Sequence, residues 1–248
     1  MVVLSPLEQF EVFSVLRCVG FSTFTWTNAT VLNVLIFSFL VIGLQQLLVR
    51  YFVIPTRWQL LHRRLYNFVT TLITENISGY LSDIFILIYF LFMFVLVANL
   101  FGMVPYCFTI TSHLIITLSL SFAFFLGINI IGVRKHGFEF LGLFLPSGAP
   151  LVIAPFIILI ELISYIARLF SLAIRLFANM MSGHTLLNIL AGFSWTMFVS
   201  GGILSVLFLI PLGIVFAVTG LELAIAGLQA YVFSVLVCIY LNDVLALH

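Results

Sequence analysis

Long apolar runs recur along this chain from residue 28 to residue 245, and they restrict the fold more than any other feature. A helix needs ~20 such residues to cross the ~30 Å hydrocarbon core of a membrane, and these runs are long enough to do so. Membrane β-strands are only ~10 residues long and alternate apolar with polar side chains, which these runs do not. The sequence therefore predicts an all-α polytopic membrane protein.

The charge content excludes several classes of function. Only 7% of the 248 residues are charged, against ~25% in soluble domains. Nine basic and eight acidic side chains nearly cancel, so no nucleic-acid partner is expected. Cys18, Cys107 and Cys238 lie far apart and have neither metal nor redox spacing. No metal and no cofactor are expected.

The N-terminal part is predicted to contain one upright span, residues 28–49. Arginines follow at positions 50, 57, 63 and 64, and basic residues mark the inner side of a membrane. The N-terminus is therefore expected on the outer side. The opening residues, MVVLSPLEQFEVF, have no basic n-region, so we expect neither a secretory signal nor a transit peptide there.

Residues 58–76 are predicted to form an amphipathic helix on the inner membrane surface. Its apolar face is formed by Leu61, Leu65, Phe68, Val69, Leu72 and Ile73. The polar side chains, including His62 and Arg63, are expected largely elsewhere on the helix. The alternative is a helix packed against the rest of the protein on that side.

Two further spans, about 83 to 104 and 113 to 133, are predicted to form a hairpin over residues 83–133, broken at Pro105. The basic residues Arg134 and Lys135 follow it and again indicate the inner side.

The C-terminal part, residues 150–247, holds two segments that are too long for upright spans. Residues 155–190 and 204–245 would give helices of roughly 55–60 Å, nearly twice the hydrocarbon core. No strong helix breaker lies in the middle of either segment. We therefore expect two long, steeply tilted helices that form a hairpin.

A polar stripe follows one face of the first long segment. Its members recur every three or four residues: Glu161, Ser164, Arg168, Ser171, Arg175, Asn179 and Ser182. In the second segment, Glu222, Gln229, Tyr240 and Asp243 follow a similar spacing of seven, eleven and three residues. Arg175 is the most demanding member, because a guanidinium at mid-bilayer costs at least ~2.5–3.5 kcal/mol on insertion scales.

Folding the two segments about residues 200–202 brings polar groups level, to within about one helical turn. The level pairs are Arg175 with Gln229, His184 with Glu222, and Glu161 with Asp243. Histidine and carboxylates exchange protons near neutral pH, whereas arginine keeps its proton. Protons could then reach the middle from either face but could not run straight through. The alternative is structural, with Arg168 simply neutralising Glu161.

Several segments resemble the family of subunit a of the F-type ATP synthase. SLAIRLFANMMSGHTLLNILAGF, residues 171–193, resembles its signature segment, and LELAIAGLQAYVFSVLVCIYLND, residues 221–243, resembles its last helix. SPLEQF, ANLFGMVPYCFTITSHL and LFLPSGAPLVIAPFIILIELISYIAR are also similar. The resemblance is closest to the mitochondrial branch, which carries His and Glu where this chain has His184 and Glu222.

The resemblance implies a stator subunit that faces a rotating ring of c-subunits, each with a carboxylate in mid-membrane. Arg175 matches the essential arginine that faces this carboxylate. The intermembrane-space half-channel is matched by His184, Glu222, Asn179 and Gln229. The matrix half-channel is matched by Glu161, Asp243 and, at its mouth, His248. We assign supporting roles to Arg168, Ser171, Ser182 and Tyr240.

Partners and location follow from the same resemblance. We expect the c-subunit ring, peripheral-stalk and other membrane subunits, and membrane lipids such as cardiolipin. The expected location is the mitochondrial inner membrane, with the N-terminus in the intermembrane space and the C-terminus in the matrix. The chain has no G-x-x-x-x-G-K-[ST] motif, so no direct nucleotide contact is expected and chemistry on ATP would belong to partners.

Three other classes compete with this interpretation. Membrane subunits of proton-pumping redox complexes rely on buried lysines, whereas the only lysine here, Lys135, lies in a basic loop. Secondary transporters tend to have repeated halves and broken helices, which this sequence does not show. The polar stripe argues against a purely structural assembly subunit.

Overall fold

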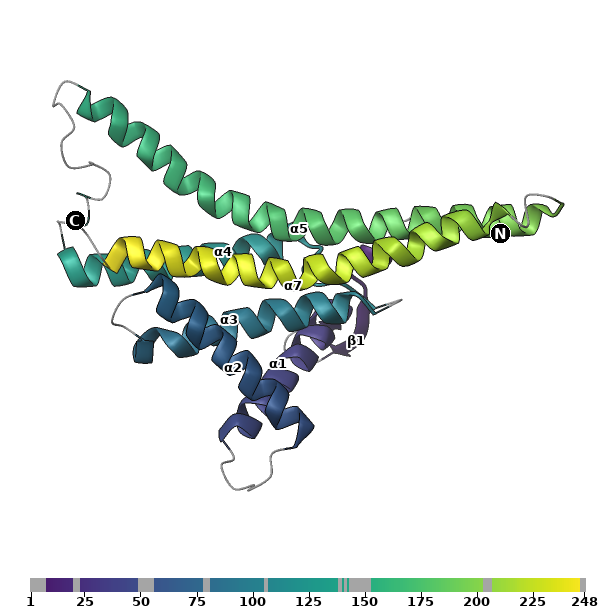
Figure 1. Ribbon diagram of the computed structural model, residues 1–248, viewed down its shortest axis with the longest axis horizontal. Helices are drawn as coiled ribbons and strands as arrows, with labels where there is room; N and C mark the ends of the chain where they lie inside the picture. Colours follow the sequence, from purple (N-terminus) through teal and green to yellow (C-terminus); the bar gives the residue numbers. More distant parts are fainter. Residues whose placement is uncertain are drawn as a thin grey trace. The chain divides into compact units, whose positions relative to one another are not determined.

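The computed structural model describes residues 8–19, 23–48, 56–77, 81–104, 107–137, 140, 142, 153–202 and 207–245. Within that part of the chain, five helices are long and apolar enough to span a membrane (Figure 1). They are α1 (Asn28–Leu48), α3 (Leu81–Gly102), α4 (Leu114–His136), α5 (Ala154–Ser200) and α7 (Leu209–Leu245). The predicted all-α polytopic class is confirmed.

The two long C-terminal helices are also confirmed. α5 has 47 residues and α7 has 37, and neither is interrupted. α5 continues beyond the expected end at Leu190 and reaches Ser200. Gly192 does not interrupt it. Gly201 and Gly202 follow at φ +74° and +67°, which glycine adopts without strain, so α5 ends at the expected turn.

A short β-hairpin precedes α1, and the sequence pattern did not predict it. The 3-10 helix η1 (Glu8–Phe10) leads into β1 (Ser14–Val19), which pairs antiparallel with β2 (Thr23–Thr27). β2 passes directly into α1 through a reciprocal cap. Thr30 N–H donates to Thr27 Oγ1 at 3.3 Å, and Thr27 N–H donates to Thr30 Oγ1 at 2.9 Å.

The chain divides into two compact units, and several helices contribute to both. The first unit comprises Met1–Phe39, Phe94–His113 and Leu176–Gln229. The second comprises Leu40–Met93, Leu114–Arg175 and Ala230–His248.

In the first unit, α3 packs on α7 through a buried amide. The side chain of Asn99 is fully buried, and its Nδ2 donates to Ala226 O at 3.3 Å. Gly102, almost one turn further along α3, lies close to Thr109 and to Met180 of α5, whose methyl carbon would be 3.2 Å from an added Cβ. Small residues therefore let these helices approach closely.

In the second unit, the amphipathic helix α2 (Arg57–Asn76) packs against α3. A capping box starts it, in which Gln59 N–H donates to Thr56 Oγ1 and Thr56 N–H donates to Gln59 Oε1. The ring of Phe68 lies 5.6 Å from that of Phe92 on α3. One face of α2 is thus covered by protein, as the packing alternative required.

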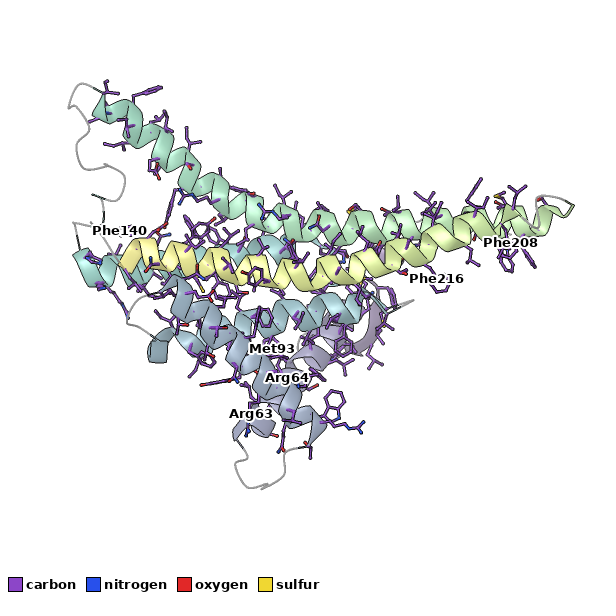
Figure 2. All side chains as sticks on the ribbon, viewed as in Figure 1. Arg63, Arg64, Met93, Phe140, Phe208 and Phe216 are labelled. Atoms are coloured by element: carbon purple, nitrogen blue, oxygen red, sulfur yellow. The ribbon has the colours of Figure 1, made fainter. Side chains whose placement is uncertain are left out.

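His62 corrects one expectation about α2. It was placed with the polar side chains, yet it is only 5% exposed, whereas Arg63 and Arg64 are exposed (Figure 2). Its ring fills the space beside Gly43 of α1, where an added Cβ would lie 2.8 Å from His62 Cε1. Burial penalises the imidazolium and so lowers the pKa of His62 below its usual range.

The ends of α4 and α7 meet in the same unit. A Cβ on Gly132 of α4 would lie 2.6 Å from Val244 Cγ1, so only glycine fits without a shift. Lys135 Nζ donates to Leu245 O at 3.0 Å, which places a cation at the carbonyl end of α7. Such a cation satisfies a terminal carbonyl and favours the helix dipole.

We expect acid to weaken the packing of α2 through His62. Its pKa is depressed in the folded state, so below pH ~6.5 the unfolded state binds the proton more readily and stability falls. Above that pH the effect vanishes. Thermal unfolding of the detergent-solubilised protein at pH about 7.5 and about 5.5 should therefore show a smaller acid-induced loss for His62→Gln than for wild type. His136→Gln is the control, and an equal loss in wild type and His62→Gln would contradict the prediction.

Candidate functional site

In the first unit, α5 and α7 are joined by a hydrogen bond between two amides. Asn179 Nδ2 donates to Gln229 Oε1 at 3.1 Å. The hairpin expectation set Gln229 level with Arg175, whereas the hydrogen bond pairs it with a residue one turn further along α5. Gln229 is 5% exposed and its Nε2 has no partner among the described residues.

Glu222 of α7 lies directly against α5 at Gly183, next to His184. A Cβ on Gly183 would be 2.7 Å from Glu222 Oε1 and 2.8 Å from its carboxyl carbon. The expected level pair of His184 and Glu222 thus meets to within one residue. Any larger side chain would occupy the volume of the carboxyl group and would force it to move.

This carboxyl group is buried without structural bonds. Glu222 is 7% exposed, and neither of its oxygens has a hydrogen-bond partner within the described residues. His184 Nε2 is likewise buried and unpartnered there. Most buried polar groups in proteins are hydrogen-bonded, and ionisable groups inside a membrane are costly. A carboxyl and an imidazole that join no structural network are suited to exchange protons.

In the second unit, Arg168 bridges two helices. Its Nη2 lies 3.7 Å from Glu161 Oε1 of the same helix, and its guanidinium carbon lies 5.6 Å from the Tyr240 ring of α7. The ion pair is the one expected under the structural alternative. Both partners' side chains are 38% exposed, so the pair leaves Glu161 open to its surroundings.

Arg175 presents its guanidinium on an exposed face of α5. Its Nη2 lies 3.5 Å from Ser171 Oγ, one turn earlier. Among the described residues of its own unit, no ion pair to Arg175 is recorded. The fixed charge is therefore directed to a surface where a partner outside the chain could meet it.

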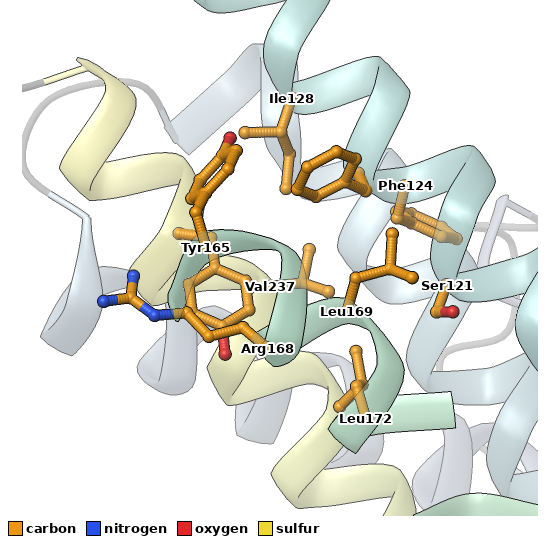
Figure 3. Close-up of a pocket in the computed structure, with 10 residues that line it drawn as sticks. Ser121, Phe124, Ile128, Tyr165, Arg168, Leu169, Leu172 and Val237 are labelled. Carbon is orange, nitrogen blue, oxygen red and sulfur yellow. The ribbon is translucent and has the colours of Figure 1, made fainter. Parts of the chain in front are cut away.

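A small cavity lies beside Arg168, between α4, α5 and α7 (Figure 3). Its volume of about 20 Å³ is enough for one or two water molecules. Its polar lining comes from Ser121, Tyr165, Arg168 and Tyr240. The rest of the lining is apolar and includes Phe124, Ile128 and Leu169, so most of the cavity wall is apolar.

Two polar residues near this cavity escaped the sequence pattern. Tyr165 OH donates to Asn129 Oδ1 at 2.9 Å and so ties α5 to α4. Tyr165 adjoins the polar stripe, being four residues after Glu161, and Asn129 is an amide within an apolar span. The sequence shows both polar residues, but it does not show that they contact each other.

The remaining expected site residues make few recorded contacts or lie outside the described residues. Asp243 is exposed near the end of α7. Its expected pairing with Glu161 is not among the contacts recorded for the described residues. Ser182 Oγ donates to Asn179 O within α5 at 3.5 Å. His248 lies outside the described residues.

Comparisons with known proteins point to one family over nearly the whole chain. The ATP synthase A chain family matches residues 24–242. ATP synthase subunit a of Chondrus crispus is 46% identical over 248 residues, covering 100% of this chain and 98% of the relative. That of Marchantia polymorpha is 50% identical over 254 residues, covering 98% and 99%. ATP synthase subunit a-2 of Arabidopsis thaliana is 47% identical over 258 residues, covering 98% and 72%.

We expect glycine to be required at position 183 but not at position 192. Gly183→Ala forces a Cβ into the Glu222 side chain, and overpacking of this kind costs ~1–3 kcal/mol. Gly192→Ala is the matched control on the same helix, because its added Cβ meets no atom within 4 Å. That change should be neutral or should stabilise by up to ~1 kcal/mol. Thermal unfolding of both variants measures the difference, and equal stability would contradict the close contact.

Proposed function

Because this chain belongs to the ATP synthase A chain family, we propose that it is the proton-conducting subunit a of an F-type ATP synthase. The observation that carries the proposal is the contact of Glu222 with Gly183, beside His184. A buried carboxyl group without a structural partner costs stability, and a proton path gives a reason to keep it. The proposal also explains why a membrane helix carries Arg175.

The outer half-channel is formed in the first unit by His184, Glu222, Asn179 and Gln229. Both His184 and Glu222 can accept and release a proton, and they are brought together at Gly183. The amide pair Asn179–Gln229 supports the path by holding α5 and α7 in register. Protons entering from the intermembrane space would pass through this group to the rotor.

Arg175 acts as the gate between the two half-channels. A permanent positive charge holds an opposing ring carboxylate ionised and repels any proton moving along the interface. Its exposed position, with Ser171 as its recorded hydrogen-bond partner, leaves it available to a subunit of the c-ring. Protons then cross only by riding the ring, and this rotation couples proton flow to ATP synthesis elsewhere in the complex.

We assign Glu161 and Asp243 of the second unit to the inner half-channel, and His248, which lies outside the described residues, to its mouth by resemblance alone. Arg168 and Tyr240 support it, since the guanidinium contacts both Glu161 and the tyrosine ring. Ser171 and Ser182 belong to the polar stripe of α5, and we assign them supporting roles.

We place the protein in the mitochondrial inner membrane, with its N-terminus in the intermembrane space and its C-terminus in the matrix. The basic clusters after α1 and at the end of α4 support this orientation. Its partners are the c-ring, peripheral-stalk and other membrane subunits, and anionic lipids such as cardiolipin. α5 and α7 lie tilted in the membrane, because each is longer than the membrane core is thick.

Arg175→Ala should abolish ATP synthesis, with a loss of at least ~100-fold, because the gate charge is gone. Arg175→Lys should fail as well, since a desolvated lysine can release its proton. The measurement is proton-driven ATP synthesis per assembled complex in reconstituted vesicles. Arg168→Lys, which keeps a charge beside Glu161, is the control and should retain most of the rate. Normal synthesis with Arg175→Ala would refute the gate.

His184 and Glu222 should behave as one functional unit. His184→Ala and Glu222→Ala should each slow ATP synthesis ~10-fold or more, and the double variant should be little worse than the slower single variant. The exchanged pair, His184→Glu with Glu222→His, should recover part of the rate. Glu161→Ala should not be coupled to this pair, because it belongs to the other half-channel. Multiplicative defects without recovery on exchange would show that the two residues do not share a proton path.

A further inference from the structure

A short N-terminal segment, Gln9–Phe13, is held at both ends in the first unit, and we call it the strap. At one end, Asn188 Nδ2 of α5 donates to Gln9 Oε1 at 2.9 Å. At the other end, Asn28 at the start of α1 donates twice. Its Nδ2 reaches Glu11 O at 3.0 Å, and its N–H reaches Phe13 O at 3.2 Å. The strap therefore connects the beginning of α1 with the middle of α5.

Phe10 lies between these two anchors and contacts His184. The ring centroids are 6.4 Å apart and the rings are inclined by 77°, an edge-to-face arrangement. Phe10 is half-buried, while Gln9 and Glu11 on either side of it are exposed. The strap thus touches α5 at two positions one turn apart, at Asn188 by a hydrogen bond and at His184 by an aromatic contact.

The imidazole of His184 needs such a contact to keep its orientation. Histidines that work in relays are usually oriented by a hydrogen bond to one ring nitrogen. His184 Nε2 is buried and has no hydrogen-bond partner among the described residues. The Phe10 ring is packed against this side chain and can supply the orientation. From α7, the titratable group that faces this turn is Glu222, next to Gly183.

We propose that the strap positions and shields the proton-accepting histidine, with Phe10 as the positioning residue for His184. The inference rests on the proposed function of His184 in the outer half-channel and adds a device that controls it. Phe10 holds the imidazole beside Glu222 and limits direct access of bulk water, while Gln9 and Asn28 keep Phe10 in place. The N-terminal segment is then part of the proton entrance.

Rates in the assembled ATP synthase test the positioning role. In reconstituted vesicles, ATP synthesis is measured against the pH of the compartment that faces the strap, at constant membrane potential. Phe10→Ala should slow synthesis about 2–10-fold per assembled complex and shift the midpoint of the pH profile. Phe10→Tyr keeps the ring and should restore both. Phe13→Ala is the matched control, because it lies in the strap with a side chain that is 62% exposed.

A chemical measurement tests the shielding role without relying on activity. Diethylpyrocarbonate modifies accessible imidazoles, and the peptide that carries His184 can be followed by mass spectrometry. Phe10→Ala and Asn188→Ala should each speed modification of His184 several-fold, about as expected for loss of one weak contact. Phe13→Ala should leave the modification rate unchanged.

The possible outcomes separate the strap from the function on which it rests. If His184→Ala abolishes synthesis while Phe10→Ala leaves the rate, the pH midpoint and the modification of His184 unchanged, the strap is refuted and the proposed function stands. If Phe10→Ala lowers only the amount of assembled complex, Phe10 is structural and the strap is also refuted. If His184→Ala itself retains normal synthesis, the assignment of the outer half-channel is wrong, and the proposed role of the strap is refuted with it.

Discussion

The contact between Gly183 and the carboxyl group of Glu222 is the constraint on which the first unit depends. The side chain of Glu222 takes the space that a Cβ at position 183 would occupy, so a larger residue there would force the carboxyl group to move. The contact also sets the register of the two helices. Two turns further along α7, Gln229 meets Asn179, which lies one turn before Gly183 on α5.

The electrostatic logic differs between the two units. In the second, Glu161 and Arg168 form an ion pair, and the guanidinium is also placed over the Tyr240 ring. In the first, the Glu222 carboxyl group and the Nε2 atom of His184 are buried without such partners among the described residues. Paired groups lower the cost of holding charge in a membrane, whereas unpaired groups keep the freedom to change protonation. Arg175 belongs to neither pattern, because it is exposed and always charged.

Continuous helices distinguish this arrangement from that of a secondary transporter. Such transporters tend to place their sites where membrane helices are broken and backbone groups are freed. α5 and α7 remain helical through every proposed site residue that the structure describes, so side chains alone supply the polar groups. A pair of continuous helices with an exposed arginine suits a stator that presents a charge to a moving partner. The membership in the ATP synthase A chain family agrees with this division of labour.

Sequence alone determined the class of fold and the identity of the polar stripe. Lipid acts as a uniform apolar solvent, so hydropathy and helical periodicity along the chain were enough to identify long membrane helices and the face that carries Arg175. The antiparallel hairpin even placed His184 near Glu222, because rise per residue in a helix is constant. These properties depend on local sequence and regular geometry.

Only the tertiary structure decided which groups are buried together. The β-hairpin before α1, the burial of His62 against Gly43 and the hydrogen bond from Tyr165 to Asn129 all escaped prediction. So did the strap, in which Phe10 reaches a histidine 174 positions away in the chain. Apart from the local β-hairpin, each of these contacts joins segments that are separated in sequence by a spacing without helical regularity. Periodicity describes a single helix in its solvent, whereas such contacts depend on which surfaces meet when the helices pack.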